Sequence, residues 1–501
     1  MQNRQQSLKP VRRVVIAGGG TAGWMAAAGI SKVLGARLDI KLIESDEIGT
    51  VGVGEATIPT LMNFHSLLEI NEQEFMAATQ ATFKLGIQFE NWRDVGQDYI
   101  HSFGTTGIDH WTAGFQHFWH KGRERKLAGD YGDYCLELKA GLANRFAHLP
   151  NNGMNYAYHL DASRYAKFLR KFAEGYGVER IEAKIAKVNV DGASGDITSL
   201  QLDSGTLVEG DLFIDCTGFR GMLIGQTMGQ PYQDWSHWLF ADSAVAVQTD
   251  SVRPAVPYTR SIAREAGWQW QIPLQHRVGN GIVFSSRYID DDVAKSSLMA
   301  NIDGAVLTEP RVIRFTPGQR EQTWAGNCVA LGLASGFLEP IESTSIHLIQ
   351  RGIVRLMQMF PTDGIFQTDI DEYNHQTASE IEHIRDFIIL HYHVTHRRDT
   401  PFWRDCASLA VPPSLRHRID LFADSGRVFR VPNELFAENS WIQVMLGQGI
   451  HPRQHHQSAE LMADDELRDF LANIQGTVDR TVKQLPSHQE YVMRYCGAAR
   501  P

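Results

Sequence analysis

The chain has 501 residues, 43% of them hydrophobic and 21% charged, so it is long enough for two or more modules around a large core. Its net charge is −10 and its lysines and arginines are scattered, which argues against the concentrated basic surface that nucleic acid or an anionic membrane needs. The five cysteines are far apart and include no CxxC pair, which argues against a disulfide framework or a zinc site and favours a reducing cytoplasm.

The first residues, MQNRQQSLKPVRR, are polar and lead directly into a short apolar run. They contain no signal-peptide core, and no later stretch approaches the roughly 20 apolar residues of a membrane helix. We therefore expect a cytoplasmic protein without a membrane partner.

The first apolar run, Val14–Ala17, is typical of a buried parallel strand. Gly18, Gly20 and Gly23 follow in GxGxxG spacing and open an Ala-rich helix; a second strand, LDIKLIES, ends in Glu44. The glycines permit a tight turn, close approach to a pyrophosphate and close packing of helix on strand. The acid is placed to bind a ribose hydroxyl. This order predicts a dinucleotide site.

Two later segments favour FAD over NAD as the dinucleotide. Residues Leu207–Gly221 and Asn327–Pro340 each combine an apolar strand with a turn of small residues, as large FAD-binding folds do where the chain returns to the flavin. A second GxGxxG for a nicotinamide cofactor is missing from the sequence. We therefore expect the flavin to be reduced by a separate protein.

Residues Ala81–Trp92, ATFKLGIQFENW, alternate between apolar and polar side chains. The period of two predicts a single amphipathic strand, with Lys84 on its polar face. By periodicity alone, this lysine is an ordinary solvated charge. Trp268 and Trp270 also share one face of a predicted strand, where core packing is the usual role of paired tryptophans.

The fold class that these patterns predict is α/β (α+β). Residues 1–350 are rich in strands and glycine, with hairpins at 184–214, and are predicted to form an FAD-binding Rossmann-type module with inserted pocket segments near 90–160. Residues 351–501 show helical periodicity and are predicted to form a mostly helical substrate module. Two histidine-rich runs are not expected to bind metal, because no acids accompany them at useful spacing; they are His391, His393 and His396, and His451, His455 and His456.

Three further segments carry a family resemblance. They are GVGEATIPT at Gly52–Thr60, WxWxIP within Gly267–Leu274, and GFLEPIESTSIHLI at Gly336–Ile349. Together with the glycine turn and Lys84, they resemble the flavin-dependent tryptophan halogenase family from Val14 to about Ile349. A weaker likeness continues at His391–Trp403.

The resemblance implies an FAD module like that of aromatic hydroxylases, joined to a helical substrate module. Reduced FAD, supplied by a flavin reductase, would turn O2 and a halide, chloride or bromide, into hypohalous acid. This oxidant would be guided to Lys84 for electrophilic halogenation of an indole-type aromatic. Glu342 aligns with the acid that sits beside the family's lysine, and Ser343 is placed next to it as a further catalytic residue.

The halide and cofactor positions also follow from the resemblance. Thr344 and Ser345 align with the residues whose backbone N–H groups hold the halide; Ser345 stands where the family pattern ESTG has glycine, which puts the halide preference in doubt. The flavin would be held by the glycine turn and by residues of the segments named above. These positions are Gly18, Gly20, Thr21, Ala22, Gly23, Glu44, Ala56, Val188, Leu333 and Ile346.

For the substrate, the resemblance implies His101, Phe103 and Trp441 as contacts, and Trp268 and Trp270 as a shield between substrate and flavin. The segment HPRQHHQS that follows Trp441 lacks the aromatic and acidic residues that grip free tryptophan, so a different indole-type substrate is favoured. Two alternatives remain: an aromatic hydroxylase of the same fold, and a flavin-binding protein without turnover. A homodimer is compatible with the sequence.

Overall fold

The structure is a computed structural model that describes residues 9–47 and 54–497. Gly52 and Val53 of the segment GVGEATIPT, and the first eight residues of the chain, lie outside these ranges. The chain forms two compact units, each built from three stretches of sequence. Unit 1 takes the described residues up to Gln80, Leu160–His237 and Arg314–Ile381; unit 2 takes Ala81–His159, Trp238–Ile313 and the described residues from Glu382 onward.

A parallel sheet forms the centre of unit 1, in the order β20-β21-β12-β1-β2-β8. All neighbouring pairs run parallel except β20 with β21. The strand predicted at Val14–Ala17 is β1, and the predicted second strand is β2, ending at Glu44. The mixed fold class is confirmed. The strands are β1 (Arg13–Ala17), β2 (Asp39–Glu44), β8 (Glu179–Glu182), β12 (Leu212–Asp215), β20 (Trp324–Ala325) and β21 (Cys328–Ala330).

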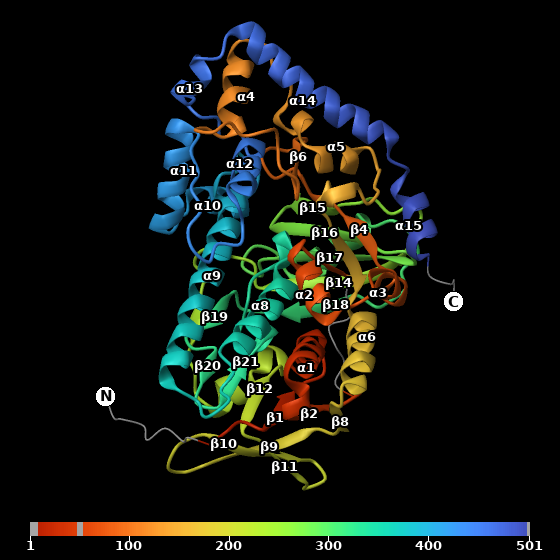
Figure 1. The fold of residues 1–501 in the computed structure, drawn as a ribbon, viewed down its shortest axis with the longest axis vertical. Helices are drawn as coiled ribbons and strands as arrows, with labels where there is room; N and C mark the ends of the chain where they lie inside the picture. The colour runs from red at the N-terminus through yellow and green to blue at the C-terminus, as the bar shows by residue number, and fades with distance from the viewer. Residues whose placement is uncertain (1–8, 48–53, 498–501) are drawn as a thin grey trace. The chain divides into compact units, whose positions relative to one another are not determined.

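Helix α1 follows β1 directly and packs against both α6 and α8 (Figure 1). Its middle is rich in alanine and glycine and fully buried. A Cβ on Gly29 would lie 2.9 Å from the Ile353 side chain, so the small residue brings α1 close to α8. The helices of unit 1 include α1 (Thr21–Leu34), α2 (Thr60–Leu68), α3 (Glu72–Thr79), α6 (Ala162–Gly175) and α8 (Ser345–Gln358).

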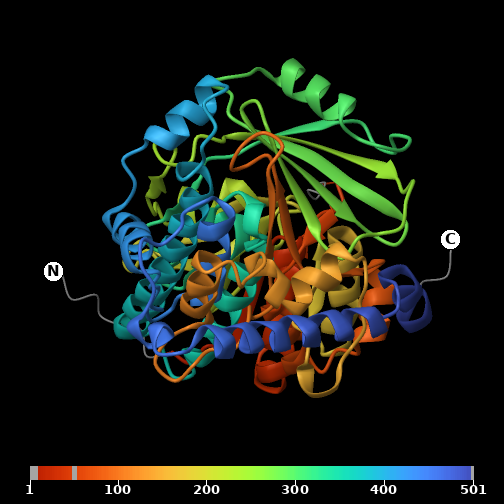
Figure 2. The same ribbon diagram turned by 90° about the horizontal axis from the view of Figure 1, so that it is seen from above.

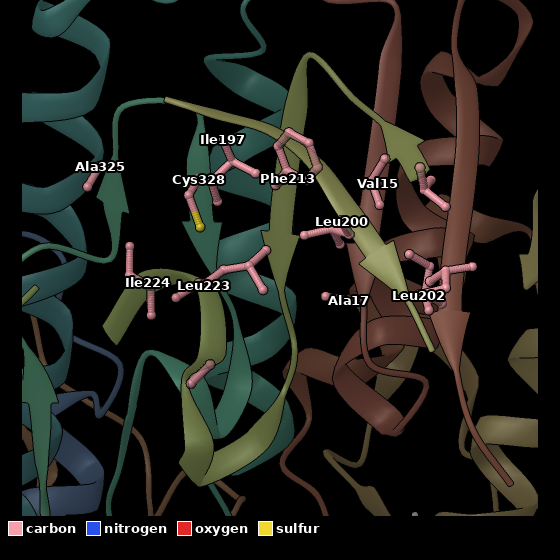
Figure 3. Packing of buried hydrophobic residues seen from close by; sticks show 14 residues of the cluster. Val15, Ala17, Ile197, Leu200, Leu202, Phe213, Leu223, Ile224, Ala325 and Cys328 are labelled. Carbon is pink, nitrogen blue, oxygen red and sulfur yellow. The ribbon is translucent and has the colours of Figure 1, made fainter. Parts of the chain in front are cut away.

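The hairpins predicted at 184–214 form a small antiparallel sheet, β11-β10-β9, which packs on the parallel sheet. Leu200 and Leu202 of β10 meet Val15, Phe213 and Cys328 in a buried apolar cluster (Figure 3). This cluster covers one face of β1, β12 and β21. The strands are β9 (Ile185–Val190), β10 (Ile197–Leu202) and β11 (Leu207–Glu209); another short sheet contains β13 (Tyr232–Asp234), β19 (Gly318–Arg320) and β22 (Gly336–Phe337).

A buried ion network joins α8 to α9 (Gln367–His393). Glu380 of α9 accepts from Arg355 at 2.7 Å and Arg351 at 3.0 Å, and its carboxylate lies 3.2 Å from His347 Nε2. Burial alone would raise the pKa of Glu380, but His347 and the two arginines outweigh it and lower that pKa to about 2. The carboxylate therefore stays ionised and fixes α8.

A long sheet forms the centre of unit 2, in the order β18-β14-β17-β16-β15-β5-β6. Figure 2 shows its strands with α7 on one face, where Ala294 and Leu298 pack on Val245 and Ile282. The elements are β5 (Gly86–Glu90), β6 (Asp98–Ser102), β14 (Ser243–Asp250), β15 (Thr259–Arg264), β16 (Gly267–Pro273), β17 (Arg277–Phe284), β18 (Arg311–Arg314) and α7 (Asp291–Ala300).

The prediction of a single amphipathic strand for Ala81–Trp92 is wrong. The chain forms β4 (Thr82–Lys84), which pairs with β7 (Ala157–Asp161), and then β5, which pairs with β15 and β6. Between them, Leu85 donates its N–H to the carbonyl of Pro257 at 2.7 Å and accepts from the N–H of Phe103 at 2.9 Å, bonds that continue the pairing of β5 with β15 and β6, so the change of partners falls between Lys84 and Leu85. Since both segments are covered, Lys84 is buried along with its apolar neighbours.

After Phe337, the described part of the chain adds helices and no further sheet strand. Within unit 2, α14 runs along α4 and α5 (Figure 1). Among all helices that the structure describes, none is both long and apolar enough to cross a bilayer. The helices of unit 2 include α4 (Phe115–Glu124), α5 (Leu136–Leu142), α10 (Pro401–Ser408), α11 (Pro413–Ser425), α12 (Glu438–Gly447), α13 (Gln457–Glu460), α14 (Asp464–Gln484) and α15 (His488–Cys496).

Replacing Glu380 with glutamine removes the buried charge that balances Arg355. We expect the free energy of unfolding to fall by about 3 kcal/mol at pH 7. A carboxyl with a lowered pKa stabilises the fold while ionised, so the difference from the wild type should be full above about pH 4.5 and shrink as the pH falls towards 2.

Urea unfolding at several pH values measures this difference. Glu382→Gln, an exposed site on the same helix, is the control and should change little. Equal effects of the two substitutions, or a loss that does not depend on pH, would contradict the role given to Glu380.

Candidate functional site

The carboxyl ends of four parallel strands meet at one edge of the sheet in unit 1. After β1, Gly18 donates its N–H to the carbonyl of Ile43 at 2.8 Å; after β12, Cys216 donates to Ala17 at 2.8 Å. After β21, Leu331 donates to the carbonyl of Asp215 at 2.9 Å. This edge is where open α/β sheets bind their ligands.

The three glycines of the GxGxxG turn have distinct roles at this edge. Gly18 has φ +103°, and a Cβ there would overlap the carbonyl oxygen of Cys216. A Cβ on Gly23 would overlap the carbonyl of Gly18, so α1 can lie close to β1 only with glycine. Gly20, the N-cap of α1, has nothing within 4 Å of its missing Cβ, so an anion can approach Thr21 and the start of the helix.

Glu44 lies beside this turn at the end of β2, and its side chain is mostly buried. Its carboxylate accepts from Arg180 Nε at 2.6 Å and from Trp24 Nε1 at 3.4 Å. These two donors hold the acid in place. Sequence reasoning missed Arg180, because β8 pairs with β2 from 136 positions further along the chain.

Asp215 at the end of β12 organises the turn that follows. Its buried carboxylate accepts from the backbone N–H groups of Thr217, Leu223 and Ile224, at 2.8 to 2.9 Å. The Thr217 hydroxyl donates a fourth hydrogen bond, at 2.6 Å. With all four bonds made to its own turn, Asp215 has a structural role. Sequence reasoning grouped it with the flavin segment but did not identify this role.

The remaining cofactor positions in unit 1 fall in different surroundings. Leu333 lies in the turn after β21, where a Cβ on the preceding Gly332 would lie 2.9 Å from Ala22. Ala56 is buried in β3 (Gly54–Ala56), and Ile346 is buried in the first turn of α8. Val188 packs against the apolar cluster under the sheet. Leu333 thus lies at the glycine turn, whereas Val188 packs in the core.

Residues Glu342–Ser345 form a tight turn before α8. Glu342 is fully buried, and Ser343 has φ +58°, a left-handed conformation that costs energy for a residue with a Cβ. Thr344 is the N-cap and Ser345 the first residue of α8, so the free N–H groups of the helix start here. The buried hydroxyl of Thr344 has no hydrogen-bond partner within the described ranges.

Lys84 is fully buried in unit 2 at the end of β4. Its Nζ lies 5.1 Å from the ring centroid of Phe103, within the range of a cation–π interaction. Burial, together with the charge of Lys84, lowers the pKa of His159 well below its usual range. His159 is therefore neutral, donating from Nδ1 to Thr82 and accepting from Thr259 at Nε2.

The loop that carries Phe103 is held by α12. Ser102 donates its N–H to Gln443 Oε1 at 2.9 Å, and Gln443 Nε2 donates back to the carbonyl of Gly104 at 3.2 Å. Asn439 Nδ2 donates to the same carbonyl at 2.6 Å. Two amide side chains therefore position Phe103, and sequence reasoning identified neither of them.

His101 and Trp441 share an aromatic neighbour, Phe387. The ring centroids lie 5.6 Å apart for His101 and 4.7 Å apart for Trp441. Trp441 is almost fully buried, its indole N–H donates to Glu434 at 2.8 Å, and Arg418 lies 4.1 Å over its ring. The donor of Trp441 is thus already used by the protein, which gives this residue a packing role.

Trp268 and Trp270 are buried side by side on β16, with ring centroids 6.1 Å apart. Across the ladders, Trp268 lies opposite Ala263 and Val283, and Trp270 lies opposite the small residues Ser261 and Gly281. Both indole N–H groups lack a hydrogen-bond acceptor in the part of the chain that the structure describes. Both side chains pack within the protein, as predicted for paired tryptophans, and their two buried N–H groups can donate to a ligand or a water molecule.

Comparisons with known proteins show the family of the chain. The Tryptophan halogenase family model matches residues 13–464. The chain belongs to this family. It is 37% identical to the tryptophan 7-halogenase RebH of Lentzea aerocolonigenes, over 97% of this chain and 99% of that one. It is 36% identical to the tryptophan 6-halogenase SttH of Streptomyces toxytricini, over 96% and 97%.

Solved structures of flavin-dependent halogenases give the same result. Xcc4156 from Xanthomonas campestris is 67% identical, with a TM-score of 0.97 over 98% of this chain and 100% of that one. BrvH from Brevundimonas sp. BAL3 is 44% identical, with a TM-score of 0.93 over 97% and 99%. The protein is a flavin-dependent halogenase.

The residues at the sheet edge in unit 1 fit the FAD that this family implies. Gly20 leaves open space at the start of α1, as the approach of a pyrophosphate requires. Glu44 is ordered by Arg180 at the end of β2, where a ribose hydroxyl is bound in dinucleotide folds. Open space at a helix start and an ordered acid are features that a dinucleotide site requires, and both are compatible with the cofactor that the family implies.

Replacing Gly20 with serine should weaken FAD binding without harming the fold. Serine is a favourable N-cap, and its hydroxyl would occupy the N–H groups and the space that a pyrophosphate needs. We expect the Kd for FAD to rise about tenfold or more, with the melting temperature of the apoprotein unchanged or raised.

Quenching of flavin fluorescence measures the Kd. Gly175→Ser adds the same side chain at the end of α6, where the missing Cβ likewise has nothing within 4 Å, and should bind FAD normally. An unchanged Kd in Gly20→Ser would remove this turn from the cofactor site.

Proposed function

We propose that this halogenase uses reduced FAD, O2 and chloride or bromide to halogenate an indole-type aromatic other than free tryptophan, with Lys84 directing the halogen. The observation that best supports this role is that the Lys84 side chain is completely buried, with its Nζ 5.1 Å from the centroid of the Phe103 ring. A charged or polar amine kept from water beside an aromatic ring is suited to hold a small polar oxidant near an aromatic substrate.

The halide is proposed to bind the backbone N–H groups of Thr344 and Ser345. The start of α8 offers unpaired donors and the positive end of a helix dipole, which favour an anion. Bound reduced flavin supplies the two electrons that activate O2, so that halide is oxidised to hypohalous acid. A separate flavin reductase is proposed to supply that reduced FAD.

Lys84 is proposed to hold hypohalous acid by hydrogen bonding or as a haloamine, and to set the ring position. In the hydrogen-bonded route, the ring carbon forms its bond to halogen as the O–X bond breaks, and the oxygen leaves as water after taking a proton. The ring then loses its own proton. For Glu342 we propose the role that the resemblance implies, a carboxylate that stabilises the charged ring and accepts this proton, with Ser343 next to it.

The proposed substrate class rests on the buried aromatic residues of unit 2 described above and on the sequence after Trp441. Phe103 and His101 are proposed to contact the indole ring, and Trp268 and Trp270 to shield the flavin. The segment 451–458, HPRQHHQS, lacks tryptophan, tyrosine and acidic residues that would bind an amino-acid group. This composition favours indole or an indole within a differently decorated molecule.

The variant Lys84→Met, of similar length but without the amine, tests the central role. We expect halogenated indole to fall to about 1% of the wild-type amount or less, while flavin oxidation and free hypohalous acid continue. Mass spectrometry measures the product and a halogen-trapping dye measures the released oxidant.

Lys295→Met, at an exposed lysine in unit 2, is the control and should keep full activity. Normal halogenation by Lys84→Met would overturn the role of this lysine. Hydroxylated product without halogen in the wild type would overturn halogenation altogether.

The substrate class has a direct test of its own. At equal concentrations of reduced FAD, O2 and bromide, we expect kcat/KM for indole to exceed that for L-tryptophan by about tenfold or more, because segment 451–458 offers no acid, tryptophan or tyrosine to the amino-acid group. A higher value for L-tryptophan would reverse the substrate assignment while leaving the chemistry intact.

A further inference from the structure

Three side chains of metal-ligating types, none of which has been assigned a role in halogenation, converge in unit 2. His120 and Glu124 are one turn apart on α4, and His455 lies just before α13. His120 Nδ1 lies 3.4 Å from His455 Nδ1, and Glu124 oxygens lie 3.3 Å from His455 Nδ1 and 3.9 Å from His120 Nδ1. Helices α4 and α13, which bring them together, are neighbours (Figure 1).

The hydrogen bonds of the two imidazoles fix which nitrogens face the centre. His120 Nε2 lies 2.8 Å from the carbonyl oxygen of Pro452, which can only accept, so Nε2 carries the proton. His455 Nε2 likewise donates to the carboxylate of Glu460. In the neutral rings, both Nδ1 atoms therefore present lone pairs, and these face one another and the Glu124 carboxylate.

Three acceptors this close repel one another unless a cation lies between them. Tetrahedral zinc binds nitrogen and oxygen at 2.0 to 2.2 Å, which places neighbouring ligand atoms about 3.3 Å apart. The separations of His455 Nδ1 from His120 Nδ1, 3.4 Å, and from Glu124 Oε2, 3.3 Å, match that value; His120 Nδ1 lies 3.9 Å from the other oxygen, Oε1, so a rotation of the Glu124 carboxylate is needed to bring one oxygen to both histidines. Two imidazoles and one carboxylate suit zinc and similar divalent metals rather than calcium or magnesium.

The surroundings complete a site of this kind. Both histidine side chains are about nine-tenths buried, whereas Glu124 is half exposed, which leaves an entry path and room for a water as fourth ligand. Glu460, which orients His455, is paired with Lys121 at 3.7 Å, and Lys121 is anchored on the carbonyls of Ala459 and Met462. Ligand histidines are commonly oriented by such a second bond to a carboxylate or a carbonyl.

We propose that His120, Glu124 and His455 bind a divalent transition metal of the zinc class, which fastens segment 451–457 to α4. The sequence predicted no metal at the run that contains His455, because no acid accompanies it at useful spacing; His120 is 335 positions away, and only the fold brings the two together. The metal has a structural role. It is independent of the halogenation chemistry, and either proposal can fail without the other.

Zinc binding to the full-length protein, prepared without a histidine tag and treated with a chelator, tests the proposal. Competition with a chromophoric chelator gives the affinity and stoichiometry, cobalt(II) absorption reports tetrahedral geometry, and thermal unfolding gives the shift in melting temperature. The variants are His455→Gln and Glu124→Gln, and His451→Gln is the matched control on the same segment. Because Glu124 is half exposed, its substitution should leave the fold intact.

We expect one zinc ion per chain, a tetrahedral cobalt spectrum and a higher melting temperature with zinc. Both ligand variants should weaken binding about tenfold or more, and His451→Gln should bind like the wild type. Absence of saturable binding in the wild type would overturn the site and leave a shared proton as the cation. Equal loss in His451→Gln, or undiminished binding in both ligand variants, would overturn it as well.

Discussion

The close approach of β1 and β12 at their carboxyl ends is the constraint on which the candidate flavin site of unit 1 depends. Gly18 lies so near the carbonyl of Cys216 that a Cβ would overlap it, and Gly23 brings α1 equally close to β1. This packing leaves the N-terminus of α1 facing open space at Gly20. A cofactor site thus arises because backbone, rather than side chains, fills the contacts around the turn.

In unit 2, the cost of burying Lys84 determines its surroundings. Burying a charge in a protein interior costs several kcal/mol unless its surroundings compensate, so its neighbours must favour it or remain uncharged. Phe103 offers the negative face of its ring, and His159 stays neutral. A fold that maintains a fully buried amine at such expense is typical of a functional position, and this agrees with the family to which the chain belongs.

The elements with a strong local signal were predictable. The apolar run before Gly18, the hairpins near 184–214 and the helical periodicity beyond residue 351 all follow from period and turn residues. Residues 81–92 were not predictable in the same way. Their side chains do alternate, but the segment forms two strands, of which β4 pairs with β7 and β5 pairs with β15. Periodicity describes which side chains share a face; it does not say how many sheets the segment joins.

The sequence by itself determined the glycine turn with its acid at Glu44, because residue types at short, fixed spacing carry it, and the family, because several separate motifs resemble it; the role expected of Lys84 followed from that resemblance alone. Only the tertiary structure decided what orients them. Arg180 reaches Glu44, Gln443 holds the loop of Phe103, and His455 meets α4. Such partners lie more than a hundred positions apart, and strand pairing and helix packing, which leave no local pattern, bring them within bonding distance.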